Sequence, residues 1–360
     1  MIDLLSYGFL PELLPQNAAG LPARVMAVHR ERYTLICEHG ETQGVLKAGV
    51  YYGRGGEDFP TTGDFVLISY QAHGESLILS TLKRKSKFSR SDFCGHAVGY
   101  AKTIREQVVA ANFDEVFIMQ SLNHDLNRKR MERYLAMAWQ SGAQPVVILT
   151  KADLTQDLPE QLRMVQEIAI GAPVFAVSAK TGQGLDALTE YLKPGRTVVF
   201  LGSSGVGKST LVNALAGESV MAVQEIREDD SRGRHTTTHR QLILLKSGVM
   251  TIDTPGMREL GMWDLTEGLG GAFADVEQYL GSCRFADCKH QSEPGCAVKA
   301  ALASGELSEE RWENYCGLTA EASYVDDRAA YQRKKQQWHK DIAMLNRHRE
   351  TVAKRNGGKR

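Results

Sequence analysis

The stretch that most constrains the fold is a glycine-rich segment near the middle of the chain, with the spacing G-x-x-x-x-G-K-[ST]. It follows an apolar run, 197–201, and leads into a second one, 211–215. Between a strand and a helix, this spacing is typical of a phosphate-binding loop, because glycines let backbone N–H groups wrap around an anion at the positive end of the helix. The predicted loop residues are Gly202, Ser203, Ser204, Gly205, Val206, Gly207, Lys208, Ser209 and Thr210.

Two side chains of this loop bring specific chemistry. Lys208 can reach the β and γ phosphates of a nucleotide and is a candidate catalytic residue, and the Ser209 hydroxyl can ligate Mg²⁺. A chance glycine-rich turn is the alternative, but the strand pattern before the segment and the helix pattern after it favour a phosphate loop. The segment therefore predicts a nucleotide-binding protein.

Length and composition suit two or three globular domains: the chain has 360 residues, of which 42% are hydrophobic. No apolar run approaches the length of a membrane span. Residues 1–20 lack the basic region and apolar core of a signal peptide. We therefore expect a cytoplasmic protein without a membrane partner.

Charge is unevenly distributed, although Lys+Arg and Asp+Glu are balanced at 43 each. Residues 328–360 hold 11 Lys/Arg against 2 Asp/Glu, which leaves 32 against 41 for the rest of the chain. A basic tail on an acidic body suggests an anionic partner, RNA first, although a solvated tail fits equally well. A second basic run, 83–87, either follows a phosphate backbone or forms a solvated linker.

The first 90 residues have the pattern of a small all-β domain. Five short β-rich runs are separated by turn residues, at 24–29, 33–37, 43–46, 64–70 and 76–82. Five strands over so short a stretch fit a closed barrel, and the OB type, whose strand face commonly binds nucleic acid, is the preferred one. An SH3-like barrel is the alternative.

From about residue 97 to residue 263, strand patterns alternate with helical ones. Strands are expected at 115–119, 146–149, 174–177, 197–201, 241–245 and 249–252, and helices at 129–141, 158–169 and 185–192. This alternation implies a doubly wound, mostly parallel sheet, which binds ligands at the carboxyl ends of its strands.

Two loops that follow predicted strands match the base-recognition elements of Ras-like GTPases. They comprise Thr150, Lys151, Ala152 and Asp153 after one strand, and Ser178, Ala179 and Lys180 after the next. The Asp153 carboxylate can accept from N1–H and the 2-amino group of guanine, whereas adenine lacks that amino group and its N1 would repel a carboxylate. The Lys151 stem can lie along the base, and the Ala179 N–H can donate to the guanine carbonyl.

The first of these loops departs from the usual N-K-x-D pattern, because Thr150 replaces the asparagine. This replacement predicts the loss of an amide that braces the loops. We expect guanine specificity to survive, because Asp153 is present.

Two further segments are expected to respond to the γ phosphate. In D-T-P-G, 253–256, Asp253 can hold Mg²⁺ through water and the Gly256 N–H can meet the γ phosphate. In the polar stretch 227–240, Thr237, with Thr236 as second choice, can complete the Mg²⁺ shell and act in catalysis.

The residue after this motif is Met257, where Ras-like enzymes often carry a glutamine that orients the attacking water. Methionine cannot do so, and we expect slow intrinsic hydrolysis that a partner stimulates. His235 is the internal candidate catalytic residue for positioning water, although a packing role fits equally well. The base-recognition loops precede the phosphate loop, which is the reverse of the usual order and predicts a circularly permuted domain.

A cluster late in the chain has the spacing C-x₄-C-x-H-x₅-C. Three thiolates and one imidazole are the ligand set of a closed, structural zinc site, which leaves no position for a catalytic water. Reduced cysteines without metal, or a zinc enzyme with an open position, are the alternatives. The metal would stabilise a small, mostly helical domain, 266–360, whose basic tail offers a surface to RNA. The predicted zinc ligands are Cys283, Cys288, His290 and Cys296.

Together these motifs resemble the RsgA family, also called YjeQ or EngC, of circularly permuted small ribosomal subunit biogenesis GTPases. The resemblance runs from about residue 24 to 296 and rests on T-K-A-D, S-A-K, G-S-S-G-V-G-K-S, G-R-H-T-T-T, D-T-P-G and the cysteine-histidine motif. It implies an N-terminal OB barrel (1–90), a central α/β permuted P-loop GTPase domain (91–265) and a C-terminal zinc-binding helical domain (266–360). It also implies a bacterial cytoplasmic monomer that binds the small subunit and its rRNA, hydrolyses GTP to GDP and phosphate when the subunit stimulates it, and couples hydrolysis to release.

Two other functions stay open from the residues alone. A nucleotide-regulated RNA-binding module or chaperone would hydrolyse GTP only incidentally. A P-loop ATPase or small-molecule kinase would let ATP compete with GTP, and Asp153 disfavours it.

Overall fold

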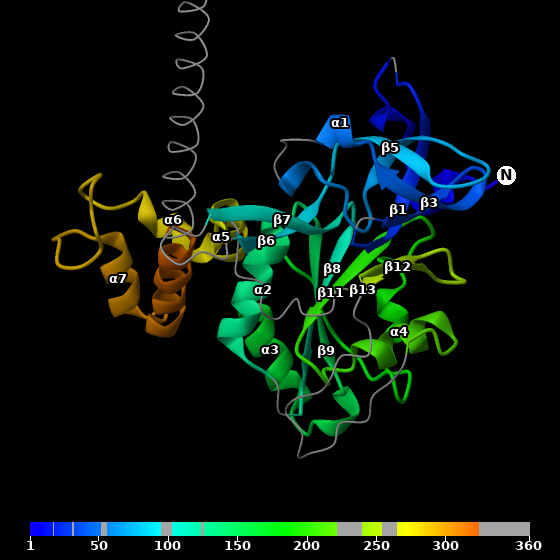
Figure 1. The fold of residues 1–360 in the computed structure, drawn as a ribbon. Helices are drawn as coiled ribbons and strands as arrows, with labels where there is room; N and C mark the ends of the chain where they lie inside the picture. Colours follow the sequence, from blue (N-terminus) through cyan, green and yellow to red (C-terminus); the bar gives the residue numbers. More distant parts are fainter. Residues whose placement is uncertain are drawn as a thin grey trace, which may run out of the picture.

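The structure, a computed structural model, describes residues 1–16, 18–30, 32–51, 56–94, 103–123, 126–221, 240–253 and 265–323. These residues form a β-barrel, a central sheet flanked by helices, and a further group of helices beside it (Figure 1). Helices long and apolar enough to cross a membrane do not occur in this part of the chain.

The described N-terminal strands close into a barrel. They pair in the order β1-β2-β3-β5-β4, and β4 returns to β1. β3 and β5 run parallel, whereas the other barrel neighbours run antiparallel. This closed order confirms the OB barrel that the sequence predicts. The elements are β1 (Leu21–His29), β2 (Arg32–Cys37), β3 (Gly40–Leu46), α1 (Ala48–Tyr51), β4 (Phe65–Ser69) and β5 (Ser76–Thr81).

The N-terminal residues cover the outside of this barrel, which the sequence did not indicate. The 3-10 helices η1 (Leu4–Tyr7) and η2 (Pro11–Leu13) lie on either side of Phe9, whose ring meets Phe65 of β4 with centroids 5.4 Å apart. The next residue, Val66, lies in the barrel interior. Both faces of β4 are therefore buried, which explains its unbroken apolar run.

The central sheet has the described strand order β10-β9-β8-β11-β13-β12, in which neighbours are parallel except for β12 and β13. Helices α2 and α3 pack on one face and α4 on the other (Figure 1). β8 to β10 precede β11 to β13 in the chain yet lie beside them, as the predicted permutation requires. The strands are β8 (Glu115–Ser121), β9 (Gln144–Thr150), β10 (Val174–Ala176), β11 (Thr197–Gly202), β12 (Gln241–Leu244) and β13 (Met250–Asp253), and the helices are α2 (Arg128–Gln140), α3 (Leu158–Ile168) and α4 (Lys208–Ala216).

Two local features differ from the expectations. The predicted helix 185–192 is only a 3-10 helix, η5 (Leu185–Leu188), because Leu188 is the single buried residue of this described stretch and Pro194 follows soon after. An unpredicted hairpin, β6 (Lys87–Cys94) and β7 (Thr103–Ala111), precedes the central sheet. The domain boundary predicted between 90 and 91 falls within β6.

The basic run 83–87 is not a solvated linker. Arg84 donates from Nε and a terminal nitrogen to the two carboxylate oxygens of Asp64, at 2.8 and 2.7 Å. The Asp64 side chain is fully buried, and that of Arg84 is 13% exposed. Two lysines of the run are paired as well, Lys85 with Asp114 and Lys87 with Glu106. Arg84 is therefore committed within the protein, whereas the side chains of Lys85 and Lys87 are 39% and 45% exposed in surface ion pairs.

The barrel and the central sheet are joined directly. β1 pairs with β12 at Ala27 and Gln241, so eleven described strands are hydrogen-bonded in one sheet. Arg24 of β1, 1% exposed, crosses this junction and donates to the Asn112 carbonyl and the Thr197 hydroxyl, each at 2.9 Å. Its further acceptors are the carbonyls of Tyr7 and Gly63 and the sulfur of Met250.

The C-terminal helices dock on α2. A Cβ at Gly268 in α5 would collide with the carbonyl oxygen of Ala136 in α2, so the two helices approach as closely as a glycine allows. Arg311, 5% exposed, forms ion pairs at 2.8 Å with Glu132 of α2 and with Asp275 of α6. The described C-terminal helices are α5 (Thr266–Ala272), α6 (Ala274–Leu280), α7 (Ala297–Ser304) and 309–323.

Candidate nucleotide site and metal centre

The predicted nucleotide loops all begin at one edge of the central sheet. β9 ends at Thr150, β10 at Ala176, β11 at Gly202 and β13 at Asp253. These strands are parallel, so their carboxyl ends point the same way. That edge is where open α/β sheets bind ligands.

The backbone of the predicted phosphate loop adopts conformations that favour glycine. Gly205 and Gly207 have positive φ, 73° and 99°. A Cβ at Gly202 would lie 2.8 Å from the Met119 carbonyl oxygen of β8, so the close approach of that strand requires glycine there. Helix α4 then begins at Lys208, and its first N–H groups lie at the mouth of the loop. Of the remaining predicted residues Val206 is buried, Ser203, Lys208 and Ser209 are half-buried, and Ser204 and Thr210 are exposed.

Thr150 makes a contact that the sequence analysis did not expect. The sequence predicted the loss of an amide that braces the loops, and in its place the Thr150 hydroxyl donates to the Val206 carbonyl at 2.6 Å. The side chain is buried, with Thr150 5% exposed. A hydroxyl therefore ties the strand before the T-K-A-D loop to the phosphate loop. The sequence reasoning missed this because it considered the amide that is absent and not the donor that replaces it.

The two base-recognition loops are linked to each other. Lys151 has positive φ, 58°, which turns the chain so that the Ala152 N–H donates to the Val177 carbonyl at 3.1 Å. The buried Ser178 hydroxyl lies beside the Asp153 carboxylate and lowers its pKa by hydrogen bonding. This hydrogen bond favours the ionised carboxylate, the form that the predicted recognition of guanine requires. Asp153 and Lys180 are exposed, and Ala179 is half-buried.

Some predicted site residues lie outside the described residues. These are His235, Thr237 and Gly256, together with Thr236 and Met257. For Asp253 the structure describes the backbone, which pairs with Gln241 of β12. The predicted switch stretch thus leads directly into β12, the strand that pairs with the barrel.

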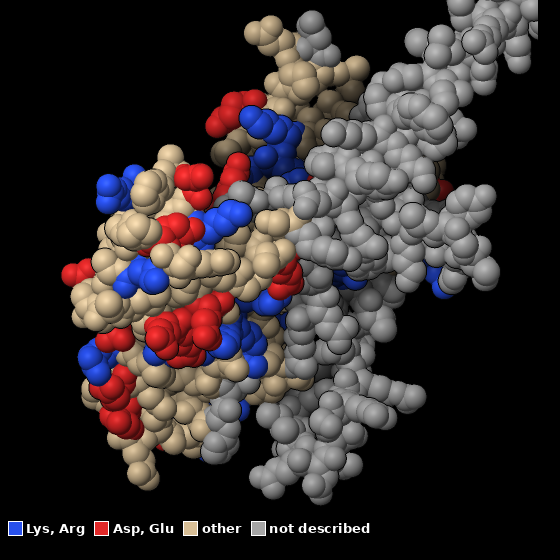
Figure 2. Space-filling model, turned by 90° about the vertical axis from the view of Figure 1, so that its left-hand side faces the viewer, with Lys and Arg blue, Asp and Glu red and all other residues tan. Residues whose placement is uncertain are grey.

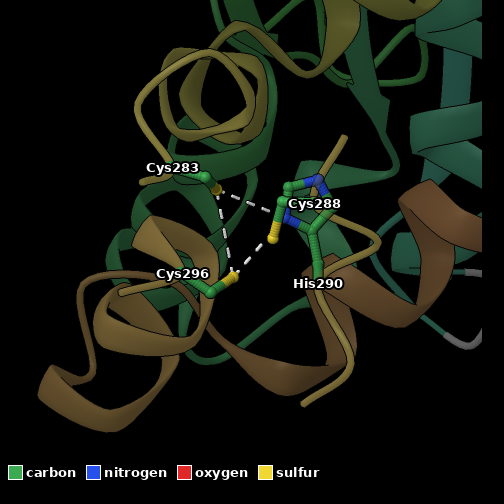
Figure 3. Close-up of side chains that lie close together, drawn as sticks. All are labelled: Cys283, Cys288, His290 and Cys296. Carbon is green, nitrogen blue, oxygen red and sulfur yellow. Dashed lines mark hydrogen bonds between the residues drawn. The ribbon is translucent and has the colours of Figure 1, made fainter. Parts of the chain in front are cut away.

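The four predicted metal ligands converge in the C-terminal part. Their side chains point toward one another (Figure 3), and the ligand atoms of Cys283, Cys288, His290 and Cys296 all lie within 4.8 Å of one another. His290 Nδ1 is 3.5 Å from the sulfurs of Cys283 and Cys296, and those sulfurs are 4.0 Å apart. Ligands at roughly 2.0–2.3 Å from one tetrahedral ion lie roughly 3.5–3.8 Å apart, so the cluster fits a metal such as zinc.

The loop that carries these ligands is held by a residue that the sequence analysis missed. The Glu293 carboxylate accepts from the N–H groups of Lys289, Gln291 and Ser292 at 2.9–3.0 Å, which lowers its pKa to about 2. His290 needs this support because it has positive φ, 60°. The short loop thus holds the ligand positions, which matches a structural metal centre.

Known proteins resemble this chain along most of its length. It matches the RsgA GTPase family over residues 81–263. It is 44% identical over 357 residues to small ribosomal subunit biogenesis GTPase RsgA 1 of Listeria innocua, an alignment that covers 98% of this chain and 99% of that protein. It is 46% identical over 325 residues to RsgA 2 of Listeria monocytogenes, covering 90% of each.

Solved structures agree with these matches. The crystal structure of YjeQ from Thermotoga maritima superposes with a TM-score of 0.62 at 28% identity and covers 84% of this chain and 98% of that chain. The structure of YloQ, a circularly permuted GTPase, has the same fold, with a TM-score of 0.58 at 24% identity and coverage of 87% and 97%. The strand order, the loops at one sheet edge and these matches lead to one conclusion: the chain belongs to the RsgA family of circularly permuted GTPases.

Proposed function

We propose that this protein binds GTP at the carboxyl edge of its central sheet, hydrolyses it to GDP and phosphate, and acts in biogenesis of the small ribosomal subunit. The observation that carries the nucleotide site is the 2.6 Å hydrogen bond from Thr150 to Val206, which ties the T-K-A-D strand to the phosphate loop. A phosphate loop alone would fit many nucleotides. Its direct link to the base-recognition loops favours a guanine nucleotide.

In the proposed site the N–H groups of the phosphate loop and of the α4 N-terminus surround the β and γ phosphates, with Lys208 as their cation. Ser209, Thr237 and Asp253 would hold the Mg²⁺ that accompanies GTP, which neutralises charge on the phosphates. Gly256 would donate its N–H to the γ phosphate. With Met257 in place of a water-orienting glutamine, we propose slow intrinsic hydrolysis, with His235 as the residue that positions water.

Guanine recognition rests on Asp153 in this proposal. Its carboxylate would accept from the guanine N1–H and 2-amino group, while the Lys151 stem covers the base and the Ala179 N–H donates to the carbonyl. Replacing Asp153 by Asn should therefore weaken GDP binding by more than tenfold, measured by calorimetry, while ADP binding stays weak. Unchanged GDP affinity would overturn the base-recognition assignment.

The metal centre is proposed to hold one structural Zn²⁺. Three cysteines and one histidine are soft ligands of the type that zinc prefers, and four protein ligands leave no open position. The metal would stabilise the loop between α6 and α7 and, through it, the helices that dock on α2. Elemental analysis of the purified protein should find one zinc per chain.

The partner is proposed to be the small ribosomal subunit and its rRNA, in line with the names of the Listeria relatives. Figure 2 shows basic and acidic side chains interspersed over the described part of the face that carries the C-terminal helices. The basic tail 328–360 lies outside the described residues and holds 11 Lys/Arg against 2 Asp/Glu, and we assign RNA contacts to it on that charge excess. A bacterial protein with this partner works in the cytoplasm, and we propose that it does so as a monomer.

GTP hydrolysis with and without purified small subunits tests this function. We expect the subunit to stimulate release of phosphate from GTP and not from ATP. Hydrolysis that the subunit leaves unchanged would favour an RNA-binding module with incidental turnover.

A further inference from the structure

We propose that Thr150 is a positioning residue that orients the phosphate loop and does not read the base. This inference rests on the proposed GTP site and assigns a role to the position where this chain departs from N-K-x-D. Three features support this role: the buried position of the Thr150 hydroxyl, its hydrogen bond to the Val206 carbonyl, and the effect of that bond on the peptide group between Val206 and Gly207.

The position of Thr150 is fixed on its backbone side. It is the last residue of β9, paired with Ser121 of β8, and its carbonyl accepts from the Leu122 N–H at 3.0 Å. Its β-branched side chain has few rotamers, and Thr150 is only 5% exposed. The hydroxyl is therefore held rigidly at the point where β9 faces the phosphate loop.

The hydroxyl has one proton, and the geometry assigns it to the loop. The Val206 carbonyl lies 2.6 Å from Thr150 Oγ1, whereas the Gln120 carbonyl lies at 3.4 Å. The shorter contact is a strong O–H···O bond, and the longer one exceeds the usual range. A proton committed to Val206 is not available to a base.

Holding the Val206 carbonyl also sets the direction of the next N–H. A trans peptide group is planar, so its C=O and N–H point in opposite directions. With the Val206 carbonyl turned to Thr150, the Gly207 N–H is turned away from β9. Gly207 precedes Lys208, the first residue of α4, and has φ of 99°. Its N–H is thereby placed among the donors that a phosphate would meet.

This arrangement separates two tasks that an asparagine could combine. An amide has a carbonyl oxygen and two N–H donors, so it can brace the loop and contact the base together. Thr150 supplies the brace alone, which leaves discrimination between bases to Asp153. Loss of the hydroxyl should therefore weaken the binding of every nucleotide that carries these phosphates, without changing which base is preferred.

The test compares GDP with inosine diphosphate, which lacks the 2-amino group, by titration calorimetry. Thr150→Val removes the hydroxyl and keeps the shape, and we expect both affinities to fall by about tenfold with their ratio unchanged within twofold. Thr150→Ser should restore most of the loss. Asp153→Asn should instead lower the ratio of the two affinities. Thr155→Val is the matched control, because the Thr155 hydroxyl is bonded to Gln161 at 2.8 Å and should leave both affinities as in the wild type.

Two results would overturn the proposal. One is a Thr150→Val variant with unchanged GDP affinity. The other is a Thr150→Val variant in which the ratio of GDP affinity to inosine diphosphate affinity falls. If Thr150→Val does not fold, as judged by thermal unfolding, Thr150→Ala against Thr150→Ser repeats the comparison with smaller side chains. A wild-type protein that binds neither nucleotide would instead contradict the proposed function itself.

Discussion

Two buried arginines join the flanking parts of the chain to the central α/β part, Arg24 to its sheet and Arg311 to helix α2, and they do so by different chemistry. Arg24 of the barrel donates to carbonyls, a hydroxyl and a thioether, all of them neutral. Arg311 of the C-terminal part meets the carboxylates of Glu132 and Asp275 at 2.8 Å. The barrel junction thus relies on strand pairing and neutral hydrogen bonds, whereas the C-terminal junction contains a buried ion pair, between Arg311 and Glu132 of α2.

The pKa shifts follow this difference. Burial lowers the pKa of Arg24 to about 10, although the charges of Asp114 and Asp64 oppose the change. Burial also acts to lower the pKa of Arg311, but hydrogen bonds and charge from Asp275 and Glu132 outweigh it and raise the pKa. Removing Arg311 would leave a carboxylate buried without its counter-charge, and removing Arg24 would leave only neutral acceptors. The first loss should therefore destabilise the fold more.

Metal removal should have the largest effect and should act on the C-terminal junction alone. Structural zinc in small domains contributes about 10 kcal/mol to folding. We expect a chelator, or Cys296→Ser, to abolish amide exchange protection in α7 and 309–323, while β1 and β12 stay protected. Full protection of α7 after elemental analysis shows the metal gone would contradict a structural zinc site.

Arg311→Met should cost about 3–5 kcal/mol in free energy of unfolding, measured with urea, because Glu132 would remain buried without its counter-charge. Combining it with Glu132→Met should recover much of that loss, since the charge leaves with its partner. A double variant that is less stable than Arg311→Met would show that the pair itself stabilises the junction.

Arg24→Met should cost about 1–3 kcal/mol, less than Arg311→Met, because its acceptors are neutral. The amides of β12 next to the barrel should exchange faster in this variant, as the junction loosens. A loss equal to or larger than that of Arg311→Met would remove the distinction between the two junctions.

Arg133→Met is the matched control for removing a cation from the C-terminal junction. Arg133 pairs with Glu321 at 2.8 Å, but both side chains are more than a third exposed, at 39% and 38%. We expect a change of about 0–1 kcal/mol. A loss of unfolding free energy close to that of Arg311→Met would mean that stability depends on the number of charges removed more than on their burial.

The features that the sequence predicted well are local. Fixed spacings encode the phosphate loop and the cysteine-histidine cluster, and apolar periodicity placed β8, β9, β11, α2 and α3 within two residues of their ends. The junctions were not predictable, because an arginine within a strand pattern gives no sign of burial. Arg24 finds Thr197 far along the chain, and only the folded topology brings the two together.

Thr150 shows the same limit at the candidate site. The motif indicated that a residue had changed, and comparison with the usual asparagine suggested a loss. The structure instead places a hydroxyl within 2.6 Å of the Val206 carbonyl, so the brace survives in another chemical form. Such a replacement depends on a distance between two loops that sequence spacing does not contain.

Phosphate release from GTP, measured with and without purified small ribosomal subunits, is the most direct test of the proposed GTPase. We predict that the protein alone releases phosphate from GTP slowly and that added small subunits increase this rate markedly. With ATP we predict no phosphate release, with or without subunits. Equal rates with and without subunits, or equal hydrolysis of ATP, would contradict a guanine-specific GTPase that acts on the small subunit.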